Sequence, residues 1–430
     1  MNWSRQEFLR ALGFAGLGLA TRASLPAAET VGAEPASDWP EFNERQPEPF
    51  WAAVRAAYQF EPGLAYLNTG GLGPVADPVL AETAAVEAAL QQRVESGHER
   101  RTAAREPVAR FLGCKPEHLA FVRNATEGNG IIAAGLDLHA GDEVIFETHA
   151  HPGGSFPWLH LARRRGIVVK TFEPDPLRPE GNVARVEALL TPRTRVVQVS
   201  HVTAPTGLIM PVRELARLCR DRGAWLHVDG AQSAGMLPLN LAELGCDSYA
   251  TSGHKWLGGP RETGLLVISP ERLDDVQPPL VGAYSGDVDR SSGAFTLNPT
   301  AERFEYGTRD NAAIVGLAAA VAWQERIGRE RLYQRDRWLV ARLRRGLKSI
   351  PDVEVLTPED PSYGSVMLTF RSSRVPFDRL FDQLMRGHGL RCRPVSEVGL
   401  NAVRVSCHFF NTPEEIDRLL TAIAQVLRAA

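Results

Sequence analysis

The chain has few cysteines, and it lacks a long apolar run. Five cysteines among 430 residues, with no CxxC pair and no metal-ligand spacing, argue against a disulfide framework and against a metal site. We expect most of these thiols to be buried as small apolar groups. No apolar stretch reaches the ~18 residues that indicate a membrane-spanning helix. We therefore expect no metal centre and no stable membrane span.

An excess of charge of one sign is also missing. The 48 Lys and Arg residues nearly balance the 51 Asp and Glu residues, which leaves a net charge of −3. Without a basic excess, a nucleic-acid partner is not expected. With 44% hydrophobic and 23% charged residues, the composition is that of an ordinary globular protein. The length allows a large domain and a smaller one.

The N-terminal segment differs from the rest of the chain. Its first ten residues contain Arg5 and Arg10, an apolar stretch follows over 11–21, and small residues stand at 26–28. A basic start, a short apolar middle and a small-residue end are typical of an export signal. The segment is similar to a twin-arginine (Tat) signal, except that Gln6 stands where the second arginine belongs. We predict a signal over 1–28 and a periplasmic or exported protein; the alternative is an amphipathic arm of a cytoplasmic enzyme.

From about residue 117, short apolar segments alternate with helical patterns. Clear strand-like segments lie at 143–146, 195–199, 225–228 and 264–268. This alternation predicts an α/β fold with a mostly parallel sheet that is covered on both faces by helices. In such sheets, ligands bind beyond the carboxyl ends of the strands.

The segment 312–349 has one long helical pattern, first apolar and then heavily charged. Strand-like and helical pieces follow it, and the last helix opens with Thr412 as N-cap and Glu415 at N3, a capping signature. These elements predict a smaller α+β domain. The predicted domain organisation is therefore an N-terminal arm over 29–75, a large domain over 76–311 and a C-terminal domain over 312–430.

Two residues at strand ends carry the candidate chemistry. Asp229 ends a predicted buried strand, and Lys255 follows another strand 26 residues later. Alone, the aspartate is typical of a turn and the lysine of a solvated loop. At the ends of two strands of one parallel sheet, however, they can face the same crevice. A desolvated lysine amine can hold a carbonyl cofactor as a Schiff base, and a carboxylate can keep the cofactor's ring nitrogen protonated.

The segment Asp229-Gly230-Ala231-Gln232, followed by Ser252-Gly253-His254-Lys255, resembles the class V aminotransferase family of fold-type I enzymes. That family includes cysteine desulfurases, selenocysteine lyases and isopenicillin N epimerases, and the resemblance extends from about residue 62 to the end. It implies that the cofactor is pyridoxal 5'-phosphate (PLP), that Lys255 carries it, and that Asp229 holds its pyridine nitrogen.

The resemblance also assigns the residues that bind the phosphate group. Thr126 and the Ala125 amide lie where a helix opens after a strand, and free N–H groups there favour an anion. Ser252 and His254 are expected to add further donors. Thr126 as a plain N-cap residue is compatible with this role.

Other matched residues concern the ring and the substrate. His151 matches the histidine that stacks on the pyridine ring, and His149 is the weaker candidate. Gln232 matches the residue that contacts the phenolic oxygen. Arg404 matches the arginine that binds the substrate α-carboxylate, for which a planar guanidinium is well suited; a lone strand arginine is otherwise more often part of a surface ion pair.

The segment 305–310 matches the part of the family dimer that reaches the neighbouring subunit's phosphate. The resemblance implies that Thr308 makes this contact and that the protein is a homodimer. Arg309 stands where desulfurase-like members usually carry a proline, and the epimerase-like members resemble the form found here. Arg309 is expected to bind a second acidic group of the substrate or to pair with Asp310.

Two departures bear on the reaction. Ala204 stands where desulfurase-like relatives carry an asparagine, and Ser396 stands where one desulfurase group carries its persulfide cysteine, with Cys392 four residues too early. We expect an isopenicillin N epimerase-like enzyme that acts at the Cα of an amino acid, by epimerisation, transamination or elimination. The alternatives are a cysteine desulfurase or C–S lyase, and a non-catalytic binding protein with the same fold.

Overall fold

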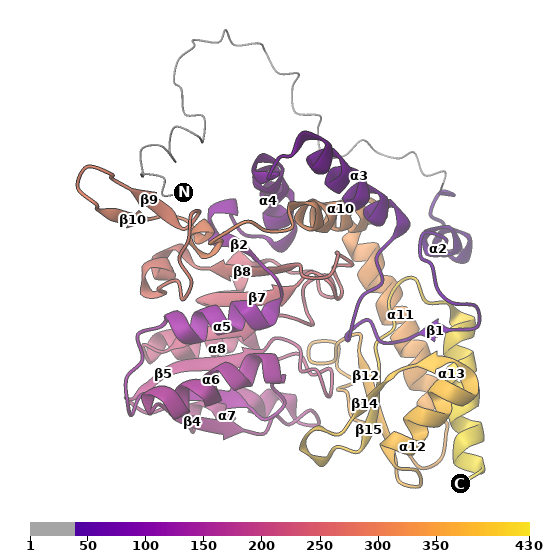
Figure 1. Ribbon diagram of the computed structural model, residues 1–430. Helices are drawn as coiled ribbons and strands as arrows, with labels where there is room; N and C mark the ends of the chain where they lie inside the picture. Colours follow the sequence, from indigo (N-terminus) through magenta and orange to yellow (C-terminus); the bar gives the residue numbers. More distant parts are fainter. Residues whose placement is uncertain (1–38) are drawn as a thin grey trace, which may run out of the picture. The chain divides into compact units, whose positions relative to one another are not determined.

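The computed structural model describes residues 39–430, and its largest sheet has seven strands in the order β2-β8-β7-β6-β5-β3-β4 (Figure 1). These strands are β2 (Leu119–Val122), β3 (Glu143–Glu147), β4 (Val168–Phe172), β5 (Thr194–Ser200), β6 (Trp225–Asp229), β7 (Ser248–Ser252) and β8 (Gly264–Ile268). Only β8 runs antiparallel to its neighbours β2 and β7. The expected mostly parallel α/β sheet is confirmed.

The central strands are buried on both faces, which explains their near-continuous apolar sequences. Side chains of β3 alternate between two clusters: Val144 packs in one core, whereas Ile145 packs in the other. The first core contains side chains of α5 (Ala125–Gly135) and α6 (Pro152–Arg165). The second contains side chains of α4, α7, α8 and α10. These are α4 (His98–Leu112), α7 (Asn182–Glu187), α8 (Val212–Asp221) and α10 (Asn311–Ile327).

The predicted single helix over 312–349 is wrong. The structure has two helices, α10 and α11 (Arg329–Lys348), which are separated at Gly328. The φ of Gly328 is +99°, a conformation that L side chains rarely adopt and glycine adopts freely. The break lets α10 pack against α3 (Asp77–Arg93) and α4, while α11 packs against α13 (Pro413–Arg428).

A second sheet is antiparallel, with the order β11-β12-β15-β14. Its strands are β11 (Val353–Val355), β12 (Leu368–Ser372), β14 (Arg393–Val395) and β15 (Ala402–Val405). The helices α11, α12 (Phe377–Asp382) and α13 supply apolar side chains to its core. The predicted capping box at the start of α13 is present, with Thr412 and Glu415 bonded reciprocally.

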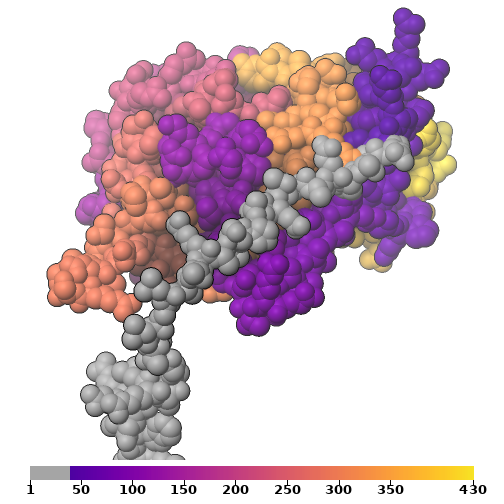
Figure 2. Space-filling view, turned by 90° about the horizontal axis from the view of Figure 1, so that it is seen from above, coloured from indigo at the N-terminus to yellow at the C-terminus, as the bar shows by residue number. Residues whose placement is uncertain are grey.

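Shorter elements connect these parts. The lead-in contains α2 (Glu48–Arg55) and β1 (Ala65–Tyr66), and β1 pairs in parallel with β13 (Leu390–Arg391). The strands β9 (Gly286–Val288) and β10 (Phe295–Leu297) form a hairpin that stands out at one edge of the face in Figure 2. The remaining short elements are α9 (Leu241–Leu244), η1 (Pro116–His118), η2 (Pro179–Gly181), η3 (Pro270–Asp275), η4 (Ala301–Phe304), the π-turn η5 (Gln383–Gly387) and η6 (Glu397–Gly399).

In the part of the chain that the structure describes, no helix combines the length and the apolar character needed to cross a bilayer. The predicted export signal over 1–28, and the start of the predicted arm, lie outside the described residues.

Candidate active site

A cavity of about 290 Å³ lies at the carboxyl ends of β6 and β7. This is the edge of a parallel sheet at which ligands bind in doubly wound folds. Nine of the predicted site residues line it: Ala125, Thr126, His151, Asp229, Gln232, Ser252, His254, Lys255 and Arg404. The folded chain therefore brings together residues that are up to 279 positions apart in the sequence.

Asp229 is the last residue of β6, and its carboxylate is held by two donors. The Ala231 N–H donates to Oδ1 at 3.0 Å, and the Asn129 side-chain amide donates to Oδ2 at 2.9 Å. Both carboxylate oxygens thus accept hydrogen bonds from fixed N–H donors, which sets the orientation of the side chain. The side chain is buried apart from the edge that faces the cavity.

Behind Asp229, a buried chain of hydrogen bonds crosses from α5 to β7. Asn129 Oδ1 accepts from His227 Nε2 at 2.8 Å, and His227 Nδ1 accepts from the Ser248 hydroxyl at 2.8 Å. Ser248 Oγ in turn accepts from Trp225 Nε1 at 2.8 Å. Burial lowers the pKa of His227 to about 4, so the imidazole is neutral with its proton on Nε2. This network fixes the direction in which Asn129 presents its amide to Asp229.

Lys255 lies in the turn after β7, on the wall of the same cavity. Burial lowers the pKa of its amine to about 8, while the Asp229 charge acts in the opposite direction. Among residues 39–430, no group donates to or accepts from this amine. The lowered pKa gives the amine a larger neutral fraction near physiological pH than an ordinary lysine has, and the neutral amine is the nucleophile for a carbonyl group.

The end of the cavity at the start of α5 carries neutral donors. Asn124 caps this helix by accepting from the Glu127 N–H, and Ala125 N donates to Ser252 Oγ at 3.1 Å. His254 Nδ1 is buried, and within the described residues it has no hydrogen-bond partner. A helix start beside an unpartnered ring nitrogen suits an anion.

Gln232 and Arg404 are held rigidly by neutral groups. Gln232 donates to Gly70 O and accepts from Trp256 Nε1. Arg404 is 1% exposed and donates to Ala204 O at 2.9 Å and to Asn68 Oδ1 at 3.0 Å. No carboxylate in residues 39–430 pairs with this guanidinium. A buried cation without a counter-ion is costly, which indicates that an anionic ligand supplies the partner.

The two histidines before α6 differ in position. His151 lines the cavity and accepts from the Gly153 N–H as the N-cap of α6. Desolvation, and then the charge of Lys255, lower its pKa. His149 is buried away from the cavity lining, and burial lowers its pKa to about 4. The geometry favours His151 over His149 as the residue beside a bound ring.

Thr308 and Arg309 do not line the cavity. Thr308 is exposed. Arg309 lies 3.6 Å from a Glu127 carboxylate oxygen, and its guanidinium stacks 5.0 Å from the centre of the Tyr306 ring. The roles predicted for these two residues, which involve a partner subunit and a second substrate acid, stay predictions.

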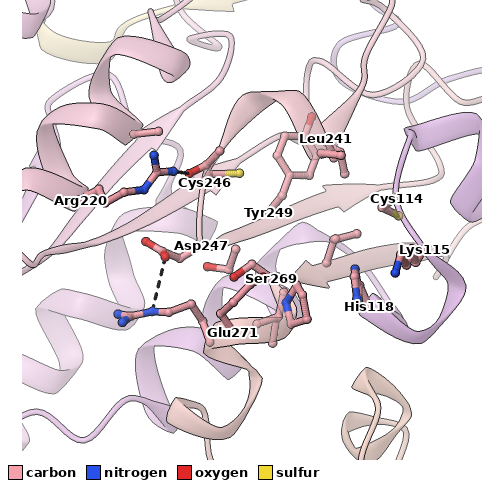
Figure 3. Close-up of a pocket in the computed structure, with 18 of the residues that line it drawn as sticks. Cys114, Lys115, His118, Arg220, Leu241, Cys246, Asp247, Tyr249, Ser269 and Glu271 are labelled. Carbon is pink, nitrogen blue, oxygen red and sulfur yellow. Dashed lines mark hydrogen bonds and ion pairs between the residues drawn. The ribbon is translucent and has the colours of Figure 1, made fainter.

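A second, larger cavity of about 700 Å³ lies at the opposite end of the sheet, where β7 begins and β8 ends (Figure 3). None of the predicted site residues lines it. Its thiols, Cys114 and Cys246, have pKa values raised to about 12 by burial, so they are poor nucleophiles. The smaller cavity therefore holds the candidate chemistry.

The family model for aminotransferase class-V matches residues 78–419. The chain belongs to this family. It is 32% identical to isopenicillin N epimerase of Amycolatopsis lactamdurans, over 87% of this chain and 98% of that protein. Among solved structures, the apo cysteine desulfurase of Thermococcus onnurineus NA1 superposes with a TM-score of 0.79 at 28% identity, covering 90% of this chain and all of that one. A C-DES variant with glycine covalently linked to its PLP cofactor gives 0.78 at 30% identity, covering 86% and 98%.

For this class V aminotransferase-family enzyme the cofactor is pyridoxal 5'-phosphate, as expected from the sequence. The cavity fits that group. It offers an unpartnered lysine amine, one carboxylate, and an anion-binding end with the orphaned His254 Nδ1. These are the partners that an aldehyde, a pyridine nitrogen and a phosphate need.

Sequence reasoning missed several residues of this class V site. Asn68, Asn129 and Arg393 contact or line it without a motif to identify them. His227 did carry a signal, because it precedes Asp229 by two on one strand and therefore lies on the same face. Arg393 becomes visible only through its pairing with β15.

Proposed function

We propose that this PLP-dependent enzyme acts at the Cα of an amino acid, with Lys255 as the residue that carries the cofactor and moves the Cα proton. One observation carries the proposal. A buried lysine with a lowered pKa shares one cavity with the Asp229 carboxyl group and with Arg404, which has no carboxylate partner in residues 39–430. The likeness to an isopenicillin N epimerase supports it.

When bound, PLP supplies an electron sink for charge that develops at Cα. The residues of the chain hold that sink in place. Asp229 would bind the ring nitrogen and keep it protonated, and Asn129 keeps the carboxylate oriented. Thr126, the Ala125 amide, Ser252 and His254 bind the phosphate group.

The same residues orient the substrate. Arg404 binds the α-carboxylate through its unused Nε–H and the free edge of its guanidinium. His151 would cover one face of the ring, and Gln232 would contact the phenolic oxygen. With carboxylate and ring fixed in this way, Lys255 Nζ, in its neutral form, would be placed to take the Cα proton.

Epimerisation, transamination and β-elimination all begin with this proton transfer. We place epimerisation first because of the similarity to isopenicillin N epimerase. A cysteine desulfurase is the second candidate, because desulfurases are among the similar structures. Against it, Cys392 is 2% exposed with its pKa raised to about 12, and the exposed residue at the position expected for a persulfide cysteine is Ser396. A C–S lyase or an inactive binding protein are the remaining alternatives.

Two features of the whole protein belong to the same proposal. The enzyme is a homodimer in which Thr308 completes the phosphate site of the partner subunit. Residues 1–28 direct its export as a folded protein, because a cofactor must be loaded before transport; the alternative location is the cytoplasm.

The test is exchange of the Cα proton. Purified holoenzyme is incubated with L- and D-amino acids in ²H₂O, and deuterium incorporation, stereochemistry, keto acid, ammonia and sulfide are measured. Lys255→Ala should lose the visible absorption of the bound cofactor and at least ~100-fold of the exchange rate, the size of a general base contribution. Lys115→Ala, at an exposed lysine outside the cavity, is the matched control and should keep both. Exchange at the parental rate in Lys255→Ala would refute the assignment.

A further inference from the structure

A second guanidinium stands directly opposite Arg404. In the antiparallel pair β14–β15, Arg393 is the register partner of Arg404. Directly opposed residues of such a pair project from the same face of the sheet. Both arginines line the cavity that holds Lys255. Like charges in this arrangement destabilise a sheet, so an anion bound near the pair would stabilise it.

The protein itself offsets only part of this charge. Glu397 Oε1 accepts from Arg393 Nη2, but Glu397 does not line the cavity. Arg393 Nη1 is buried and, within residues 39–430, has no acceptor. Among the described residues, Arg404 has no carboxylate partner, and Asp229 is the only carboxylate that lines the cavity. One donor group of Arg393 is therefore left for a ligand.

Arg393 lies at the reacting end of the cavity. It lines the cavity together with Lys255, His151 and Arg404. Burial lowers the pKa values of these three groups, and the charge of Arg393 acts in the same direction. The phosphate-binding residues come from α5 and the turn after β7, on the large sheet. Arg393 comes from the second sheet, beside the residue that binds the substrate carboxylate. Its position therefore suits the substrate and not the phosphate.

We propose that Arg393 binds a second acidic group, carried on the substrate side chain, and that the substrate is a dicarboxylic amino acid. The inference rests on the proposed function, because it assumes that Arg404 binds the α-carboxylate. The second acid accepts from Arg393 Nη1, which has no acceptor in the described residues, and competes with Glu397 for Nη2. A carboxylate on this donor gains a charge-assisted hydrogen bond that a side-chain amide cannot match.

The experiment titrates the holoenzyme with L-glutamate and L-2-aminoadipate, and with the matched side-chain amides L-glutamine and L-homoglutamine. The change in the visible absorption of the cofactor gives each Kd. The parent should bind the acids at least ~10-fold more tightly than the amides, and Arg393→Gln should abolish that preference by weakening the acids alone. Glu397→Gln removes the competing carboxylate and should strengthen binding of the acids.

Arg391→Gln is the matched control, because Arg391 is exposed two residues away and does not line the cavity; it should leave all four Kd values unchanged. If Arg393→Gln does not fold, Arg393→Lys and Glu397→Gln carry the test. Equal binding of acids and amides by the parent would overturn the inference but leave the proposed function intact. Equal weakening of both classes in Arg393→Gln would place Arg393 on the α-carboxylate and overturn it too. If no amino acid alters the absorption of the parent, the proposed function itself fails.

Discussion

At the scale of single residues, burial tunes the amine of Lys255. The pKa falls from 10.5 to about 8 because the charged form is poorly solvated, although the neighbouring carboxylate of Asp229 partly restores it. At pH 8 about half of the amine is then neutral, against well under 1% for an ordinary lysine. The neutral amine is the form that can react with a carbonyl group.

This shift predicts how the cofactor loads. After removal of PLP, the rate at which the apoenzyme recovers its visible absorption should rise with pH, reach half its maximum near pH 8 and level off above it. Asp229→Asn removes the charge that favours the ammonium form, so its midpoint should move to lower pH. Stopped-flow absorbance across pH 6–11 measures both. A rate that keeps rising beyond pH 10 would mean that the amine has an ordinary pKa.

A second residue-scale prediction concerns Cys392. Desulfuration needs an accessible thiolate, and this thiol is buried with its pKa raised to about 12. Cys392→Ser should therefore leave any sulfide release from cysteine unchanged, within about 2-fold of a parent that is itself slow. Sulfide is assayed with a reductant present. Fast release in the parent that is lost in the variant, with cofactor still bound, would instead establish a desulfurase.

The site residues at strand ends could be predicted from the sequence, whereas the role of Arg393 could not. Asp229 and Lys255 follow apolar strands, and parallel strands end at one edge of a sheet, so their meeting is predictable. The pairing of Arg393 with Arg404 depends on the register of two short strands. The turn that connects these strands contains Val398 and Asn401, both at positive φ. Nothing in the local sequence specifies that register.

At the scale of elements, the hydrogen-bond chain links α5, β6 and β7 behind the cofactor site. Asn129→Leu would leave Asp229 Oδ2 without its donor and His227 Nε2 without its acceptor. We expect the free energy of unfolding to fall by about 1–3 kcal/mol for these unmet groups. Exchange at Cα in the folded holoenzyme should fall by ~10-fold or more, because the carboxylate loses its orientation.

The control for Asn129→Leu is Asn182→Leu. Asn182 is also buried and hydrogen-bonded, but to the Asp175 and Pro179 backbone far from the cavity. Urea unfolding should show a similar loss of stability, while the exchange rate of the folded enzyme stays at the parental value. If both variants lower the exchange rate alike, the network has only a structural role.

The break between α10 and α11 shows why element boundaries are harder to predict than element types. Helical patterns continue on both sides of Gly328, and an isolated glycine is tolerated inside a helix. The chain turns there because α10 must cover the large sheet while α11 packs against the helix that covers the second one. That requirement is tertiary, and the local sequence does not carry it.

At the scale of the whole molecule, the N-terminal segment predicts a location. Residues 1–35 fused to a reporter that is active only after folded export should carry it out of the cytoplasm, because the segment has the three-part composition of a signal. Arg5→Lys should reduce that transport, and Gln6→Arg should increase it by restoring the second arginine. A reporter that stays inside with all three sequences would show that the segment is not a signal.

The last prediction is the homodimer. Thr308 is exposed, and large apolar side chains gather nearby in the chain at 280–297, where Leu280, Val281, Val288 and Phe295 are each about half exposed. Val288 and Phe295 belong to the β9–β10 hairpin, which projects from the surface in Figure 2, and exposed apolar side chains that form one patch are typical of interaction sites. Phe295→Asp should weaken a dimer seen by light scattering, whereas Phe156→Asp, at an exposed ring on α6, should not.

Thr308→Val should keep the dimer but weaken cofactor binding by about 10-fold, the loss of one hydrogen bond to a charged group. A monomeric parent with full cofactor affinity would contradict both the dimer and the role of Thr308.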